Sequence, residues 1–428
     1  MAEALLESLL ERAPGAPAAR SVAVAALRRD GLPTARDESW KYTGLRALGQ
    51  RRLLAGDAGA ASRAIDAATF ALPGVAGPRL VFVNGVYRAD LSEPGDLAGL
   101  TLLPLSAHPG ELVALLHAEE GERADAFLRL NTALVADGAL VRVGAGVRIE
   151  TPLHLVFVGA PAEGDLAWQA RLRIELGEGA ALSVVEHHAG AGAHAHLGNL
   201  VAEHVLAAGS RLDLLQVQDA SAGSTLIRRD AFHLDRAALL SAHALELGAQ
   251  TARHDFRVDL AGPEARLVSR GTFALTGRQH ADTHIDVRHL ARDTACDIAW
   301  RGAADQRARG VFHGAITIEA GADGADAQLS NKNLLLSAQA EIDTQPVLVI
   351  HADEVKAAHG ATVGQLDEQA LFYLRTRGIP REAARRLLVT AFCGAMLDGI
   401  ASEELRGHLG GLLALRLPQA RDAASGQA

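Results

Sequence analysis

The middle of the chain, residues 137–363, is dominated by short segments in which apolar and polar residues alternate. In one such segment, Leu172, Ile174 and Leu176 are separated by charged residues. A period of two places the apolar side chains on one face of a β-strand. This region is therefore predicted to consist of strands, each with one buried face.

Turn residues separate these strands at nearly constant intervals. With Gly146, Gly179, Gly209, Arg236 and Glu264 as turn positions, the intervals are 33, 30, 27 and 28 residues. Regular spacing is typical of repeat proteins, in which each turn of chain buries its apolar face against the next. A β-sandwich also has many short strands, but the pattern continues too long without a helical insertion for one sandwich. We therefore predict a β-helix (β-solenoid) core and a mainly β protein.

Two helical lobes are predicted to flank this core. Residues 1–136 read as a helical and mixed N-terminal lobe, in which Asn84-Gly85 between two β-prone runs predicts a hairpin over 79–88. Residues 364–428 read as a small helical C-terminal lobe. Its predicted helix N-termini are at Asp367, Pro380 and Ser402. Helices of the N-terminal lobe are expected at 17–29, 109–118 and 124–135.

Composition narrows the classes of partner and of site. The 428 residues include 42 Lys and Arg against 51 Asp and Glu, a formal charge of −9, which argues against nucleic acid or an anionic membrane as the main partner. Two cysteines cannot supply a four-thiolate zinc or iron–sulfur module. The acidic amphipathic start is no secretory signal, and no apolar run approaches a membrane span. A cytoplasmic protein that makes no contact with a membrane is expected.

Histidines are the first candidates for chemistry. One cluster comprises His187, His188, His194, His196 and His204. Such a cluster can hold a transition metal, but no recognised ligand spacing completes it. We expect His194 and His196 to lie in a polar loop between turns of the solenoid, and the role of the cluster stays open.

A second cluster contains His280, Asp282, His284, Asp286 and His289. On a strand, the first four share one face by the period of two. Such a row can bind a metal ion or simply line a solvated face, and we expect the solvated face.

The remaining motif search argues against a conventional catalytic site. Cys296 lies in a strand-like stretch and Cys393 in an apolar helix, and since no base stands beside either in sequence, both are expected to be buried and inert. The sequence contains no Walker A loop, no HExxH motif and no G-x-S-x-G elbow. We therefore expect a protein that is not an enzyme.

Several spaced motifs agree with one known family. They are Gly310-Val-Phe-His-Gly-Ala-Ile316, Asn331-Lys-Asn-Leu-Leu-Leu-Ser337, Glu341-Ile-Asp-Thr-Gln-Pro346, His359-Gly-Ala-Thr-Val-Gly364 and, near the start, Glu38-Ser-Trp-Lys-Tyr-Thr43. Together they resemble the SufB/SufD family of the SUF iron–sulfur cluster assembly system, and within it the SufD branch.

The resemblance implies a right-handed parallel β-helix core with helical termini. It also implies a non-catalytic scaffold that pairs with a SufB-like subunit through the β-helices and binds a SufC-like ATPase through its C-terminal helices. The complex builds nascent clusters, so iron or a cluster would be present transiently, with no cofactor held stably by this chain alone. Flavin binding stays open, and the isolated chain is expected to form a homodimer through the same edge.

The resemblance also assigns residues. His359 matches a histidine proposed to help form or hold the cluster at the SufB interface, and His284 and His289 are weaker metal candidates at positions where histidine is frequent. The family usually has Cys-Ser before the histidine that corresponds to His359, whereas this chain has Ala357-Ala358 there. Residues 363–388 match the segment that contacts SufC. The candidate contacts in that segment are Asp367, Leu371, Phe372, Tyr373 and Arg377.

Two alternatives from other classes remain. A β-helix enzyme acting on carbohydrates would use Asp, Arg and His on adjacent turns, although the aromatic content of 4% offers few stacking platforms for sugars. A self-associating structural protein is the other.

Overall fold

The computed structural model describes residues 2–11, 13, 15, 17–56, 64–117 and 125–417. The C-terminal residues 418–428 of the predicted C-terminal lobe lie outside this range, as do positions 118 and 124 at the ends of two predicted helices.

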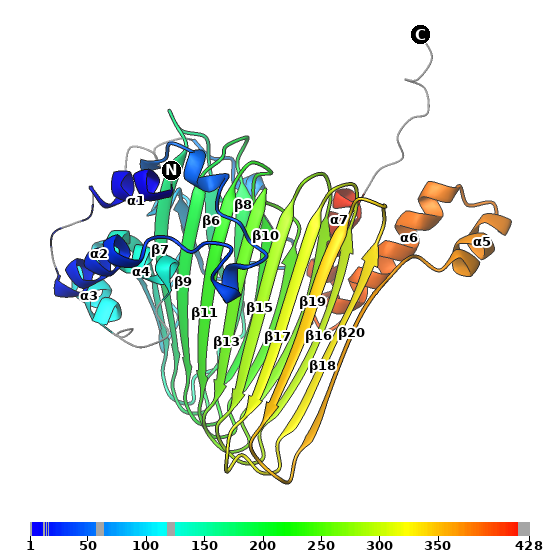
Figure 1. The fold of residues 1–428 in the computed structure, drawn as a ribbon. Coiled ribbons are helices and arrows are strands. Elements are labelled where there is room, and N and C mark those ends of the chain that lie inside the picture. The colour runs from blue at the N-terminus through cyan, green and yellow to red at the C-terminus, as the bar shows by residue number, and fades with distance from the viewer. Residues whose placement is uncertain are drawn as a thin grey trace.

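The core is a parallel β-solenoid of about eight turns, which confirms the predicted fold class (Figure 1). Each turn contributes one strand to each of two facing sheets, which we call the odd sheet and the even sheet after their strand numbers. The odd sheet contains β5 (Asp137–Val143), β7 (Leu166–Leu176), β9 (Leu197–Leu206), β11 (Thr225–Leu234), β13 (Thr251–Leu260), β15 (His280–His289), β17 (Arg309–Ile318) and β19 (Glu341–Ile350). The even sheet contains β6 (Leu153–Gly159), β8 (Ala181–Gly190), β10 (Arg211–Asp219), β12 (Leu239–Glu246), β14 (Arg266–Leu275), β16 (Ala295–Ala304), β18 (Asp326–Leu335) and β20 (Lys356–Gly364).

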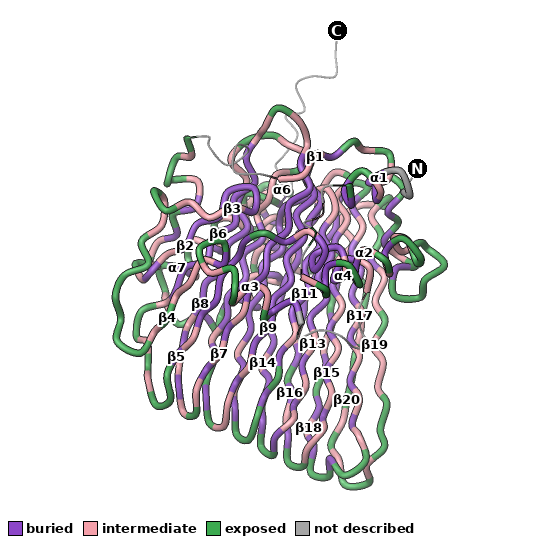
Figure 2. Tube along the Cα trace, turned by 90° about the vertical axis from the view of Figure 1, so that its left-hand side faces the viewer, coloured by how far each residue is buried: buried purple, intermediate pink, exposed green. Residues whose placement is uncertain are grey.

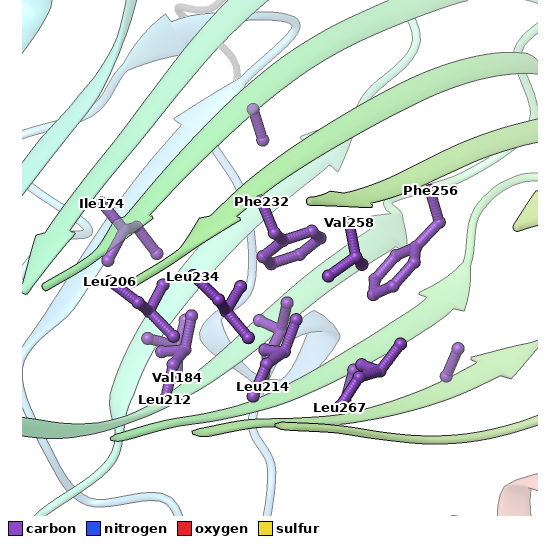
Figure 3. Close-up of a cluster of buried hydrophobic side chains, with 14 of the residues drawn as sticks. Ile174, Val184, Leu206, Leu212, Leu214, Phe232, Leu234, Phe256, Val258 and Leu267 are labelled. Carbon is purple, nitrogen blue, oxygen red and sulfur yellow. The ribbon is translucent and has the colours of Figure 1, made fainter. Parts of the chain in front are cut away.

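The hydrophobic core fills the space between the two sheets. Neighbouring turns pair in register, so that Ile174 of β7 lies beside His204 of β9 and Leu182 of β8 beside Leu212 of β10. Leucine, valine and phenylalanine side chains from the two sheets point toward one another (Figure 3). Leu172 and Ile174, which the alternation placed inside, are fully buried. Small aliphatic residues thus fill a solenoid that has few aromatic rings.

The turns that connect the sheets use backbone conformations favoured by glycine. Gly179 and Gly209 have φ values of +66° and +65° at two successive turns. At the next turn the left-handed residue is Ala237, with a φ of +54°, one position after the predicted Arg236. Glu264 occupies the following turn at +63°. An L-residue pays a steric cost in this region of the backbone map, which glycine avoids.

The N-terminal region closes one end of the solenoid and adds strands to it. β2 (Arg79–Val83) pairs with β6 and forms with β3 (Val86–Tyr87) the predicted hairpin. β4 (Leu100–Pro104) runs antiparallel to β5, and β1 (Leu54–Ala55) pairs with β7. These strands therefore cover the edges of the first turn in both sheets.

Helices pack on the outer faces of the two sheets (Figure 1). α1 and α4 contribute to an apolar cluster that also includes residues of β7, β9 and β11 on the odd sheet, while α6 and α7 pack on β8 to β16 of the even sheet. Asp367 and Ser402 cap α5 and α7 through their side chains, as predicted. None of the described helices is long and apolar enough to span a membrane. The helices are α1 (Ala2–Leu10), α2 (Ala18–Asp30), α3 (Pro109–His117), α4 (Ala126–Leu134), α5 (Glu368–Thr376), α6 (Arg381–Gly394) and α7 (Glu403–Arg416).

Candidate functional site

The last turn of the solenoid is uncovered. β19 and β20 are the terminal strands of their sheets and pair on one side only, with β17 and β18. Interior-facing residues at both ends of this turn are exposed. Ile350, beside the fully buried Ile318, is 43% exposed, and Val363, beside the buried Asn333, is 41% exposed, whereas Ile342 stays buried. The final strands are accordingly coloured intermediate and exposed, whereas the middle of the solenoid is mostly buried (Figure 2). The core therefore ends in an apolar surface.

His359 lies within this open end. In β20 it is the register partner of Leu329, which belongs to the core, so the imidazole faces the interior side of the last turn and is exposed because no further turn covers it. Its neighbours Ala357 and Ala358 bring no thiol to the site. Among the described residues, no three His, Cys, Asp or Glu side chains are arranged to hold a metal ion. The described residues of this end thus offer one imidazole and no thiolate.

Two asparagines of β18, in the turn before this end, hydrogen-bond to the last turn. The Thr344 hydroxyl donates to Asn331 Oδ1 at 2.8 Å, and Asn333 Nδ2 donates to the Thr362 carbonyl at 3.2 Å. Both asparagines are buried. These bonds tie β18 to β19 and β20, and thereby fix the frame on which His359 is presented.

The C-terminal segment presents a second exposed surface. Phe372 and Tyr373 of α5 are 66% and 57% exposed, and the Arg377 guanidinium lies 5.2 Å from the Tyr373 ring. Leu371, another of the predicted contacts, is on the buried side of α5, and Asp367 caps the N-terminus of this helix. Large exposed aromatic side chains are the usual anchors of protein interfaces.

The row on β15 does not lie on a solvated face, so that prediction is wrong. Residues 37–43, which we call the strap, cross the outer face of the odd sheet and cover it (Figure 1). Thr43 Oγ1 lies 2.7 Å from His280 Nε2 and donates to Asp282, whose side chain is buried. Burial by itself raises the pKa of Asp282, but His284, Arg253 and Thr43 outweigh it and lower the pKa to about 2.

A cavity of about 460 Å³ lies between the strap and the sheet. His284 of β15 and His313 of β17 line it, with their rings 4.9 Å apart. Tyr42 and Glu38 of the strap form the other wall. No local pattern in the sequence indicates this cavity, because its two walls are separated by more than two hundred residues of chain.

His289, the other weak metal candidate, is inside the solenoid. Its Nδ1 lies 2.8 Å from Thr294 Oγ1 and its Nε2 lies 3.3 Å from Cys296 Sγ. Burial lowers the pKa of His289 to about 4 and raises the pKa of the Cys296 thiol to about 12. Cys393 is buried in α6, and burial raises its pKa to about 11. Both thiols are therefore buried and protonated at neutral pH, as expected.

The histidines of the first cluster are dispersed. His194 and His196 lie in the loop between β8 and β9, as predicted, and stack with ring centroids 4.2 Å apart. His187 stacks on His154 instead, at 5.9 Å. His204 and His188 face the interior of the solenoid.

His188 and His204 belong to a buried ionic network inside the solenoid. Arg228 pairs with both Glu186 and Asp230, and His204 and His254 lie 3.0 Å and 2.9 Å from the Asp230 oxygens. Burial by itself lowers the pKa of His254, but Asp230 and Glu246 outweigh it and raise the pKa. The alternation could not reveal this network, since inward charged residues have the same period as outward ones.

Comparison with known proteins places these features in a family. Residues 157–392 match the family model described as "SUF system FeS cluster assembly, SufBD core domain", and residues 10–155 match "SufBD protein N-terminal region". A curated iron–sulfur cluster assembly SufBD family protein of Synechocystis is 31% identical over 391 residues, which is 88% of this chain and 86% of the relative. The iron–sulfur cluster assembly protein SufD of Escherichia coli is 30% identical over 92% of this chain and 91% of its own length. The SufD of Bacillus subtilis is 26% identical over 72% of this chain and 71% of its own length.

Proposed function

Because the chain belongs to the SufB/SufD family of the SUF iron–sulfur cluster assembly system, we propose that it is a non-catalytic scaffold subunit on which clusters are built. It pairs through the open end of its solenoid with a SufB-like subunit and binds a SufC-like ATPase through the C-terminal segment 363–388, which includes α5. The observation that carries this proposal is the uncovered last turn, in which the interior-facing Ile350 and Val363 are exposed.

An open solenoid end is unfavourable in an isolated protein. Repeat proteins normally close their ends with a polar cap, and an unpaired strand edge readily accepts another strand. Here the first turn is capped by β2, β3 and β4, whereas β19 and β20 have free edges. A second solenoid of the same width would both pair with these edges and cover Ile350 and Val363. The same edge gives the isolated chain a route to a homodimer.

The chemistry of the open end fits a supporting role in cluster assembly. Clusters are held mainly by thiolates, but both thiols of this chain are buried and their pKa values are raised. His359 can supply one imidazole at the seam, and the partner supplies the sulfur ligands. The iron and the cluster are cargo that leaves with a carrier, and so the chain needs no resident cofactor.

The decisive experiment separates the two proposed surfaces. In co-expression with a SufB-like subunit and a SufC-like ATPase, Ile350→Asp with Val363→Asp should abolish recovery of the SufB-like subunit, because two charges would be buried in an apolar seam. The matched control is Val22→Asp on α2, where a valine is 59% exposed far from this end. Equal recovery by the double variant and the control would refute the seam.

Phe372→Ala should weaken binding of the ATPase at least tenfold while the SufB-like subunit is retained. Leu415→Ala, an equally exposed position on α7 at 67%, is the control. His359→Ala should leave both partners bound but lower the yield of cluster in anaerobic reconstitution with iron and sulfide. Wild-type yield by that variant would limit His359 to a structural role.

A further inference from the structure

The outer face of the odd sheet brings together two histidines and one aspartate beneath the strap. His284 of β15 and His313 of β17 are register partners on adjacent strands, and Asp282 precedes the first by two residues on the same face. All three therefore point outward toward the strap. Neither the proposed scaffold role nor the open end of the solenoid uses them.

The candidate ligand atoms of this trio are buried and have few partners. His284 Nε2 and Asp282 Oδ1 form an ion pair at 2.9 Å, whereas His313 Nε2 has no hydrogen-bond partner among the described residues. Buried polar groups in native proteins are nearly always paired, so the unpaired imidazole nitrogen beside this ion pair calls for an explanation.

The spacing of these atoms fits coordination of one ion. First-row divalent metals bind imidazole nitrogen and carboxylate oxygen at about 2.0–2.2 Å. Two ligands at right angles on such an ion are therefore separated by about 3 Å. The observed separation of 2.9 Å between His284 Nε2 and Asp282 Oδ1 matches that edge.

The second oxygen of Asp282 is held by other neighbours, so that the first one faces His284. Arg253 Nη1 donates to Asp282 Oδ2 at 2.8 Å, and Thr43 of the strap donates to the same oxygen. Arg253 is in turn fixed by Asp255 at 2.8 Å and by the Trp40 ring at 4.2 Å. Metal-binding carboxylates are typically oriented by outer partners of this kind.

The cavity supplies access. Its volume of about 460 Å³ leaves room for an ion that keeps several water molecules. Asp37 and Glu38 lie on the strap side of the cavity, where their carboxylates attract cations, and Gln345 of β19 adds an amide beyond His313. The site is thus acidic at its mouth and carries nitrogen ligands at its floor.

We propose that Asp282, His284 and His313 bind a first-row divalent metal ion, with ferrous iron the favoured occupant. Two imidazoles and one carboxylate with open positions form the ligand set preferred by non-haem Fe(II). No three such residues among those described are preassembled around an ion, so His313 turns to close the site. No hydrogen bond to its Nε2 opposes this rotation. Ion binding itself does not depend on the proposed scaffold role, whereas its use as an iron entry point rests on that role.

The test uses the full untagged chain and the metal alone. Co²⁺ is titrated anaerobically by calorimetry and visible absorption, and Fe²⁺ by equilibrium dialysis, with X-ray absorption to count imidazole ligands. The wild type is expected to bind one ion with two imidazoles. His284→Gln and His313→Gln should each weaken binding at least tenfold. Thr43→Val, which removes one of the two donors to Asp282 Oδ2, should weaken it by about tenfold.

A matched control keeps the result specific. His351→Gln removes an exposed histidine after β19 and should bind Co²⁺ like the wild type. His313 is only half-buried, so its variant tests the site even where His284→Gln fails to fold. Wild-type affinity in His313→Gln, or no stoichiometric binding by the wild type, would overturn the proposal. Retained Co²⁺ binding in a chain that recovers no partner would overturn the scaffold role alone.

Discussion

The histidines buried in the solenoid should make the protein sensitive to acid, and His289 allows this to be measured for one residue. Its side chain is fully buried between Thr294 and Cys296. Burial lowers its pKa from 6.5 to about 4. A difference of this size corresponds to about 3 kcal/mol between the two protonation states.

The sign follows from proton linkage. Between pH 6.5 and pH 4 the unfolded chain binds a proton at this histidine and the folded chain does not, so the stability contributed by neutral His289 is present above pH 6.5 and is lost as the pH falls. Integrated from pH 7.5 to pH 5.0, the loss is about 2 kcal/mol. Burial lowers the pKa values of His154, His187 and His188 in the same way, so the whole protein should lose more.

The perturbation is His289→Gln, which keeps a polar side chain but cannot titrate. At pH 7.5 the variant should be less stable by about 1–2 kcal/mol, because the hydrogen bonds to Thr294 and Cys296 are altered. At pH 5.0 this deficit should shrink by about 2 kcal/mol, so that the variant equals or exceeds the wild type.

Urea unfolding at equilibrium, followed by circular dichroism at several pH values, provides the measurement. His351→Gln, at an exposed position, is the control and should run parallel to the wild type at every pH. If His289→Gln also runs parallel to the wild type between pH 7.5 and 5.0, the buried neutral imidazole is not a source of acid lability and the reasoning fails.

Replacing Gly179 by Ala should lower the free energy of unfolding by about 1 kcal/mol, because its φ of +66° suits glycine. Ala237→Gly should raise the free energy of unfolding by up to about 1 kcal/mol, because Ala237 has a φ of +54°. Urea titrations measure both changes. Asp230→Asn should destabilise by about 3–5 kcal/mol, because the buried Arg228 and His254 each lose one of their two carboxylate partners, and the thermal midpoint should fall accordingly. Cys296 and Cys393, whose pKa values burial raises to about 12 and 11, should react with an alkylating reagent only as fast as the protein opens.

The solenoid could be predicted from the sequence because its information is local. Strand positions such as Leu172 and Ile174 repeat with a period of two, and Gly179 and Gly209 mark the turns. The prediction of a solvated face on β15 was wrong because the segment that covers this face is distant in sequence. Thr43 of the strap contacts Asp282, which lies 239 residues further along the chain. No local period records which strand face a distant segment will cover.

In the candidate sites too, local features could be predicted from the sequence and contacts between distant segments could not. The position of His359 in the last strand before the C-terminal helices was evident from the pattern, but the exposure of the interior at that turn depends on where pairing stops. The cavity at His284 and His313 needs both the register of two strands and the path of the strap. Juxtaposition in three dimensions, rather than residue type, separates what was predicted from what was missed.

The surface that stabilises the late turns of the solenoid is not the surface left open at its end. This explains how the chain can leave its last turn uncovered. α6 packs Val389 and Cys393 against Ala274 and Ala303 on the outer face of the even sheet, and Arg301 of β16 donates to the Phe392 carbonyl at 2.7 Å. These contacts brace the late turns from outside, so their pairing does not depend on a further turn. The edges of β19 and β20 are therefore unpaired in a stable chain. If the proposed partner binds there, substitutions at these edges should weaken assembly without unfolding the chain.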